Sequence, residues 1–211
     1  MVGRSVRVEL TAMPFTVPIA AIVLLYIWVL EPFAPQWLRP LPTVAVLALS
    51  IARAIKTGQW GVNREAFLPA LRAAVVLTFC AIGAFTLAGM MLETLHARPN
   101  PLGDLAFLLL WGCGQQFVLQ TVVLPEAHAT SDERRAPLLA ATLFGALHLP
   151  NPFLSAVTFI GGVFWCRIYL RHPNILPLAL SHALATMAIL VSFNESVTGR
   201  LRVGVSYLLL D

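Results

Sequence analysis

The chain has 211 residues, of which 58% are hydrophobic and only 11% are charged, and its mean hydropathy is +0.80. Soluble domains carry about 25% charged residues, so this composition excludes a soluble globular domain, and it equally excludes a disordered chain, a coiled coil or a fibre. The net charge of +4 comes from basic residues scattered between apolar runs, which excludes the clustered basic stripe of a nucleic-acid-binding protein. We expect an all-α, polytopic membrane helix bundle that forms a single transmembrane domain over residues 1–211.

Seven apolar runs follow one another along the chain, and each predicts a transmembrane helix, because about 20 apolar residues span a bilayer. Helix breakers mark the ends of two of them: Glu31-Pro32 closes the first run and Pro125-Glu126 closes the fourth. The seven predicted spans cover residues 13–30, 37–55, 73–95, 105–124, 137–149, 153–170 and 175–193.

Three segments outside these spans have distinct patterns. Residues 56–71 are amphipathic and are predicted to lie at the membrane interface. Residues 131–135 form a charged loop. Residues 203–210 are apolar but too few to cross a bilayer.

The orientation of the bundle is predicted by its Lys and Arg residues, which accumulate in short cytoplasmic loops. A cytoplasmic N-terminus and an external C-terminus place ten of the fourteen basic residues inside and four outside. The inside set is Arg4, Arg7, Arg53, Lys56, Arg64, Arg72, Arg134, Arg135, Arg167 and Arg171, and the outside set is Arg39, Arg98, Arg200 and Arg202. Arg39 and Arg53 lie near the ends of the second span, where their side chains are expected to snorkel to the interface.

Five glutamine and histidine side chains lie inside the predicted spans, where burial of a polar group is costly and therefore needs a reason. The fourth span contains Gln115, Gln116 and Gln120, and the last two share one helix face because they are four residues apart. The fifth span contains His148 and the seventh contains His182. At a rise of 1.5 Å per residue, Gln116, His148 and His182 lie about 12–16 Å from the cytoplasmic ends of their helices. This matched depth predicts one buried site inside the bundle.

Each of these polar residues also has a purely structural interpretation. A single histidine in a membrane span can hydrogen bond to a neighbouring helix, and a glutamine amide is a common interhelical contact. Four glycines are expected to permit close helix approach, and three widely separated cysteines are expected to be core residues. The glycines are Gly112, Gly114, Gly161 and Gly162, and the cysteines are Cys80, Cys113 and Cys166.

Three short motifs succeed one another in the second half of the chain. Phe144 and His148 form a Phe-x-x-x-His motif, residues 159–169 contain a glycine pair, and residues 174–182 end in a histidine. In their order and spacing, the motifs of the region 111–193 resemble the CPBP family of intramembrane proteases. This family comprises the CAAX prenyl proteases and bacteriocin-processing enzymes and is also called the Abi family. The resemblance implies that residues 111–193 form the family's core region.

The resemblance also implies which residues form the active site. The family's first motif, Glu-Glu-x-x-x-Arg, falls on three glutamines, so both acids and the arginine are replaced. The second motif matches at Phe144 and His148, and the third, His-x-x-x-Asn, matches at His182 but has Thr186 in place of the asparagine. In the family a glutamate is taken to activate a water, while the histidines and the asparagine stabilise the oxyanion. The implied catalytic residues are Gln115, Gln116, Gln120, His148, His182 and Thr186.

The chemistry of the substituted residues limits their roles. A glutamine amide cannot accept a proton near neutral pH and so cannot be a general base, but it can donate to an oxyanion or hold a water. Either His148 or His182 could be the base, because imidazole has an ordinary pKa of about 6.5. The same two histidines could hold a zinc ion, with Cys113 a conceivable third ligand, although two histidines alone make a poor zinc set. Beyond such a divalent metal, no cofactor is expected.

The favoured functional hypothesis is an intramembrane endopeptidase that hydrolyses a peptide bond in a membrane-associated protein or peptide. The alternative is a catalytically silent relative that binds a membrane peptide or a lipidated tail as a chaperone or regulator. A transporter is a third hypothesis, but the two related halves that it predicts are not visible in the sequence. A rhomboid-type serine protease is disfavoured because Ser181 directly adjoins His182. The expected partners are the substrate and the lipid bilayer, without nucleic acid, and the expected location is the cytoplasmic (inner) membrane of a bacterium.

Overall fold

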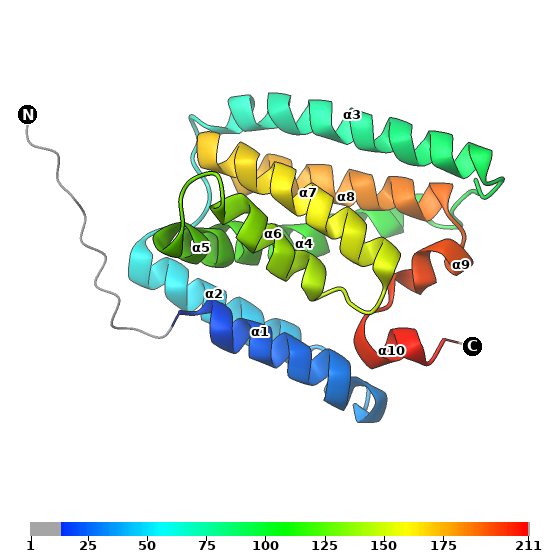
Figure 1. Cartoon of the computed structure of the whole chain (residues 1–211), viewed down its shortest axis with the longest axis horizontal. Coiled ribbons are helices and arrows are strands. Elements are labelled where there is room, and N and C mark those ends of the chain that lie inside the picture. The colour runs from blue at the N-terminus through cyan, green and yellow to red at the C-terminus, as the bar shows by residue number, and fades with distance from the viewer. Residues whose placement is uncertain (1–13, 211) are drawn as a thin grey trace, which may run out of the picture.

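The computed structural model describes residues 14–210, and helices account for most of them (Figure 1). Within this part of the chain no β-strand occurs, apart from an isolated bridge between Val62 and Asn174. The predicted all-helical class is therefore confirmed. Arg4 and Arg7, which contributed to the predicted orientation, and Met13, with which the first predicted span begins, lie outside the described residues.

Ten α-helices are found between residues 14 and 210, and short π and 3₁₀ turns extend some of them. The α-helices are α1 (Thr16–Leu25), α2 (Leu41–Thr57), α3 (Phe67–Met91), α4 (Pro101–Val118), α5 (Leu124–Thr130), α6 (Ala136–Ala146), α7 (Pro152–Arg171), α8 (Ile175–Ser192), α9 (Glu195–Thr198) and α10 (Gly204–Leu208). The π turns are Tyr26–Leu30 and Leu119–Val123, and the 3₁₀ turns are Glu31–Phe33 and Gly199–Leu201.

Five helical stretches are long and apolar enough to cross a membrane. They are Thr16–Phe33, Phe67–Met91, Pro101–Thr130, Pro152–Arg171 and Ile175–Ser192. The other two predicted spans correspond to α2, with 17 residues, and α6, with 11 residues. Both are shorter than the roughly 20 residues that a straight transmembrane helix needs, so the predicted total of about seven spans is not confirmed by helix length.

The end predicted for the fourth span is wrong, because the helix passes through Pro125 and continues to Thr130. Proline has no N–H and therefore cannot donate to the carbonyl of Thr121, four residues earlier. In the structure Arg53 Nη1 donates to this carbonyl instead. The π turn directly before Pro125 and the arginine from α2 together accommodate a residue that normally ends a helix.

The segment predicted to lie at the interface, residues 56–71, is not one amphipathic unit. α2 ends at Thr57, where Gly58 adopts the left-handed conformation with φ of +70°, and α3 begins at Phe67. The connection between them is tied to the start of α8. Asn174 Nδ2 donates to the Asn63 carbonyl at 2.8 Å. The amide of the next residue in α8 donates to the Gly61 carbonyl at the same distance.

The core forms where α8 packs against α3 and α4, and where α6 packs against α7. Two of the four glycines singled out in the sequence lie close to the backbone of another helix, as predicted: a Cβ on Gly112 would lie 3.1 Å from the Ala179 carbonyl oxygen, and one on Gly162 would lie 3.3 Å from the Ala141 Cα. Gly114 and Gly161 face only side chains. The central buried cluster contains Ala74, Leu119, Val123, Leu124, Ala136, Ala140, Phe144, Trp165, Cys166 and Leu178.

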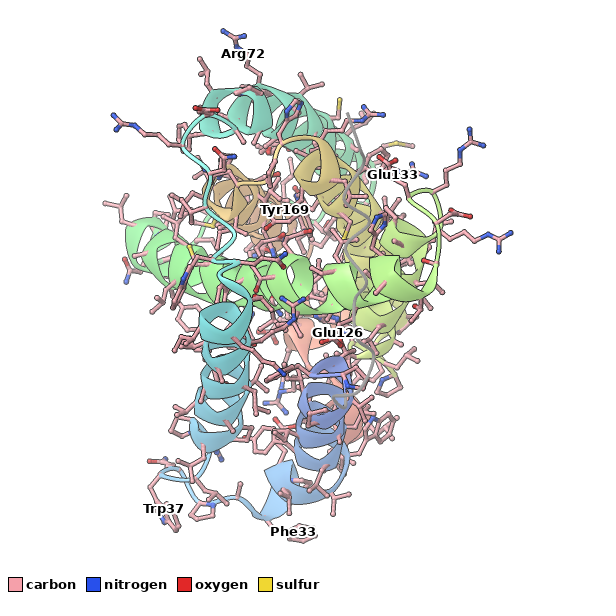
Figure 2. The ribbon with its side chains drawn as sticks, turned by 90° about the vertical axis from the view of Figure 1, so that its left-hand side faces the viewer. Phe33, Trp37, Arg72, Glu126, Glu133 and Tyr169 are labelled. Carbon is pink, nitrogen blue, oxygen red and sulfur yellow. The ribbon has the colours of Figure 1, made fainter. Side chains whose placement is uncertain are left out.

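The α1–α2 hairpin lies along one side of this core and is drawn below it in Figures 1 and 2. Phe33 and Trp37 form its tip and are 84% and 73% exposed. At the opposite end of the hairpin, the Glu126 carboxylate accepts from the amides of Phe15 and Thr16, at 2.9 Å each. The first helix thus begins on a carboxylate supplied by α5, a favourable partner for the unpaired N–H groups of a helix start.

Candidate active site

A cavity of about 1540 Å³ lies between the α1–α2 hairpin and the other helices. Its walls come from α1, α2, α3, α4, α6, α7 and α8 and are mostly aliphatic and aromatic. Among the few polar side chains that line it are four of the predicted site residues: Gln115, His148, His182 and Thr186. Gln116 and Gln120 do not line the cavity but are fully buried behind it.

His182 lies on α8 and is held on two sides. Its ring stacks on the indole of Trp165, with centroids 4.6 Å apart and planes at 20°. Its Nδ1 lies 3.4 Å from Gln116 Nε2. Because an amide nitrogen can only donate, Nδ1 is the acceptor and the proton of the neutral ring is on Nε2.

His148 lies in the turn that follows α6, and its ring is oriented from within its own motif. Its Nδ1 lies 2.6 Å from the carbonyl oxygen of Phe144. A carbonyl oxygen can only accept, so Nδ1 carries the proton and Nε2 keeps its lone pair. Among residues 14–210 the imidazole has no further hydrogen-bond partner. The two histidines are therefore held in opposite tautomers.

Phe144 connects the two histidines. Its ring meets His148 edge-on at a centroid distance of 5.0 Å and His182 edge-on at 6.2 Å. The phenylalanine of the Phe-x-x-x-His motif thus has two structural uses, since its carbonyl orients one imidazole and its ring contacts both. Aromatic contacts of this edge-to-face kind contribute about 0.5–1.5 kcal/mol beyond the area that they bury, and so help to hold both imidazole rings in place.

The three glutamines have different surroundings. Gln120 Nε2 donates to Gln116 Oε1 at 3.0 Å, and both side chains are fully buried. Gln115 is half-buried at the cavity wall. Thr186 Oγ1 donates to the His182 carbonyl within α8 at 2.9 Å, so its only proton is used inside the helix.

The described residues do not gather a metal-ligand set around the histidines. Between residues 14 and 210 no group of three or more His, Cys, Asp or Glu side chains is close enough to hold a metal ion. Cys113 lines the same cavity as the histidines but belongs to no such group. Since zinc sites use at least three protein ligands, these residues do not fit the predicted zinc possibility.

Sequence reasoning missed a second polar cluster near this site. Arg53, expected to snorkel at a helix end, is instead only 8% exposed, and its Nε lies 3.6 Å from Glu126 Oε1. The only sequence signal for this ion pair was that one base, Arg53, and one acid, Glu126, each lie beside an apolar run in a chain with few charges.

A separate hydrogen-bonded group surrounds Ser181. Its Oγ accepts from Trp165 Nε1 at 3.1 Å and hydrogen bonds with Thr78 Oγ1 at 2.8 Å.

Comparisons with known proteins agree with the predicted resemblance to the CPBP family. A family model described as type II CAAX prenyl endopeptidase Rce1-like matches residues 98–188. No curated protein and no solved structure matches the chain. The matched region contains all six predicted site residues, and the five long apolar helices fit an integral membrane protein. Residues 98–188 are therefore similar to the Rce1-like type II CAAX prenyl endopeptidases.

Proposed function

We propose that the protein is an intramembrane endopeptidase that hydrolyses a peptide bond in a membrane-associated protein or peptide, with His148 as its general base. The observation that carries this proposal is the hydrogen bond between His148 Nδ1 and the Phe144 carbonyl. It leaves Nε2 as a proton acceptor on a side chain that lines the cavity. A glutamine at the family's glutamate positions cannot accept a proton from water near neutral pH, whereas a neutral imidazole can.

His182 has the complementary role in this proposal. Since its Nδ1 faces the Gln116 amide, its Nε2–H can donate to the oxygen of a scissile carbonyl as negative charge develops there. The stacked Trp165 ring holds the plane of this donor. Thr186 replaces the family's asparagine and is assigned no proton-transfer role, because its hydroxyl donates within the helix.

The proposed reaction proceeds in two proton-balanced steps. His148 Nε2 takes a proton from a water as the water oxygen attacks the carbonyl carbon, and His182 stabilises the resulting oxyanion. The carbonyl then re-forms, the C–N bond breaks, and His148 returns its proton to the leaving amine nitrogen. No step passes through a metal ion, so chelators are expected to leave turnover unchanged, and elemental analysis of the purified protein checks its metal content.

The test uses the full-length protein in proteoliposomes with a panel of membrane-anchored peptides. We expect the natural sequence to cleave at least one peptide and His148→Ala to lower kcat about 10²–10⁴-fold, the usual contribution of a general base. His128→Ala is the matched control, because this histidine is exposed on α5 and does not line the cavity. Equal loss in both variants would refute the assignment of the base.

Two outcomes separate this proposal from a catalytically silent relative. Binding of a peptide without turnover by the natural sequence would contradict the proposal. In that case the triple variant Gln115→Glu, Gln116→Glu and Gln120→Arg, which restores the family's first motif, should create proteolysis that the natural sequence lacks. Cleavage by the natural sequence that depends on His148 contradicts the silent alternative.

A further inference from the structure

Two buried amides form a chain that ends on His182. Gln120 Nε2 donates to Gln116 Oε1 at 3.0 Å, and Gln116 Nε2 lies 3.4 Å from His182 Nδ1. Both glutamine side chains are 0% exposed, so solvent does not compete for their hydrogen bonds. The spacing of four residues places both amides on the same face of the continuous helix formed by α4 and the π turn.

The direction of this chain has a chemical consequence. An amide presents an oxygen that accepts and a nitrogen that donates, so a donor at the Gln116 oxygen turns its nitrogen toward the histidine. In the reverse order His182 Nδ1 would donate to the Gln116 oxygen, and the Gln116 nitrogen would donate to the Gln120 oxygen. The buried Gln120 nitrogen, with its two N–H groups, would then have no partner in the chain. In the observed order the Gln120 oxygen is the atom without a partner among residues 14–210.

The atoms in contact decide between the two orders. The Gln120 nitrogen lies 3.0 Å from the Gln116 oxygen, and the Gln116 nitrogen lies 3.4 Å from His182 Nδ1. The number of unpaired groups does not distinguish the orders, because the observed one leaves the oxygen and one N–H of the buried Gln120 amide unpaired and the reverse one leaves both of its N–H groups unpaired. The chain therefore has a preferred polarity, running from Gln120 to Gln116 to His182.

We infer that Gln116 and Gln120 are positioning residues that fix the tautomer of His182, so that its Nε2 carries the proton. The catalytic value of this tautomer rests on the function proposed above, in which Nε2–H donates to the oxyanion. The tautomer itself does not rest on that function. A carboxylate at position 116 would instead accept from Nδ1 and place the proton there.

The test reads the tautomer directly by NMR of the full-length protein in micelles with ¹⁵N-labelled histidine. The protonated and unprotonated ring nitrogens have widely separated ¹⁵N shifts, and the signals of His182 are identified by their loss in His182→Asn. We expect the natural sequence to show Nε2–H at this residue. Gln120→Met removes the donor at the start of the chain and keeps the approximate volume of the side chain without adding a charge. The Gln116 amide can then rotate to present its oxygen to His182, and the Nδ1–H form should appear beside the Nε2–H form.

One further variant controls this experiment. Gln59→Met makes the same chemical change at an exposed position outside the site, and it should leave the His182 signals unchanged. An Nδ1–H tautomer in the natural sequence, or a tautomer that does not respond to Gln120→Met, would overturn the inference.

Turnover provides the second measurement. Molecules in the Nδ1–H form of Gln120→Met lack the oxyanion donor, so kcat should fall in proportion to their fraction with little change in KM, because the interaction is made in the transition state. A tautomer that behaves as expected in a protein that cleaves no peptide would support the positioning role and refute the proposed function. A tautomer that stays fixed while His148-dependent cleavage persists would refute the positioning role alone.

Discussion

Arg53 illustrates how a single residue can connect several elements. Its guanidinium donates to the Thr121 carbonyl and lies beside Glu126, which in turn accepts from the first amides of α1. This cluster joins α2, the π turn, α5 and α1 at one end of the cavity, and Figure 2 shows Glu126 at the start of α1. Because Thr121 directly follows Gln120, the same arginine supports the backbone that carries the buried amides.

The first residue-scale prediction concerns this buried charge. Arg53→Met should lower the free energy of unfolding by about 3–5 kcal/mol, because it leaves the Glu126 carboxylate without its buried partner. The double variant Arg53→Met with Glu126→Gln should lose less, since no unpaired charge remains and an amide oxygen can still accept from α1. Thermal unfolding in detergent micelles measures both. A double variant less stable than Arg53→Met would contradict the ion-pair assignment.

The residues of the site were predictable from sequence only where depth along one helix determines position. The helix rise gave similar depths for Gln116, His148 and His182, and the structure brings the two histidines to one cavity with Gln116 behind His182. The stacking of Trp165 on His182 was not predictable, because it depends on the rotation of α7 relative to α8. Arg53 was misjudged for the same reason, since position near a helix end does not show which face is covered.

Helix contacts at the level of whole elements decide whether the amide chain can form. Gly112 lies one turn before Gln116 on α4, and a Cβ there would lie 3.1 Å from the Ala179 oxygen and 3.7 Å from the His182 Cβ on α8. The absence of a side chain at this glycine therefore lets the two helices approach closely enough for the 3.4 Å contact between Gln116 and His182.

Gly112→Ala and Gly114→Ala form a matched pair that tests this contact. Both replace a helical glycine and gain a similar helix propensity, but a Cβ on Gly114 meets only the Leu47 side chain at 3.7 Å. We expect Gly112→Ala to be less stable than Gly114→Ala by about 1–3 kcal/mol, the usual cost of overpacking. The His182 tautomer should become mixed in the first variant only. Equal stabilities would show that α4 and α8 have room to separate.

The apolar pattern predicted the bounds of α7 and α8 well, but α3 begins six residues before the start and ends four residues before the end of the predicted span 73–95. α7 and α8 begin and end within one residue of the predicted spans, because continuous apolar runs bounded by Asn and Pro mark both of their ends. The pattern failed at Pro125 and over residues 56–71, where tertiary hydrogen bonds from Arg53 and Asn174 override the local signal. Propensity describes a segment by itself and does not include a partner from a distant helix.

At the scale of the whole molecule, the connecting segments gather at two opposite ends. At one end Asn151 Nδ2 donates to the Thr198 carbonyl at 2.8 Å, and the Gly204 amide donates to the Leu149 carbonyl at 2.9 Å. The connection before α3 and the start of α8 meet at the other end, where α5 also lies (Figure 1). α6 packs along α7 and joins these two ends despite its 11 residues. This arrangement favours a crossing by α6.

The last prediction tests that crossing and the orientation together. Glu133 precedes α6, Ser196 follows α8, and both are exposed. If α6 crosses, three crossings separate the two positions and they lie on opposite sides of the membrane; if it does not, two crossings separate them and they lie on the same side. The distribution of Lys and Arg favours a cytoplasmic Glu133 and an external Ser196. In a variant whose three native cysteines are alanine, we therefore expect Glu133→Cys to be labelled by an impermeant maleimide only from the cytoplasm and Ser196→Cys only from outside. Labelling of both from the same side would show that α6 does not cross, and labelling from the two reversed sides would invert the orientation while keeping the crossing.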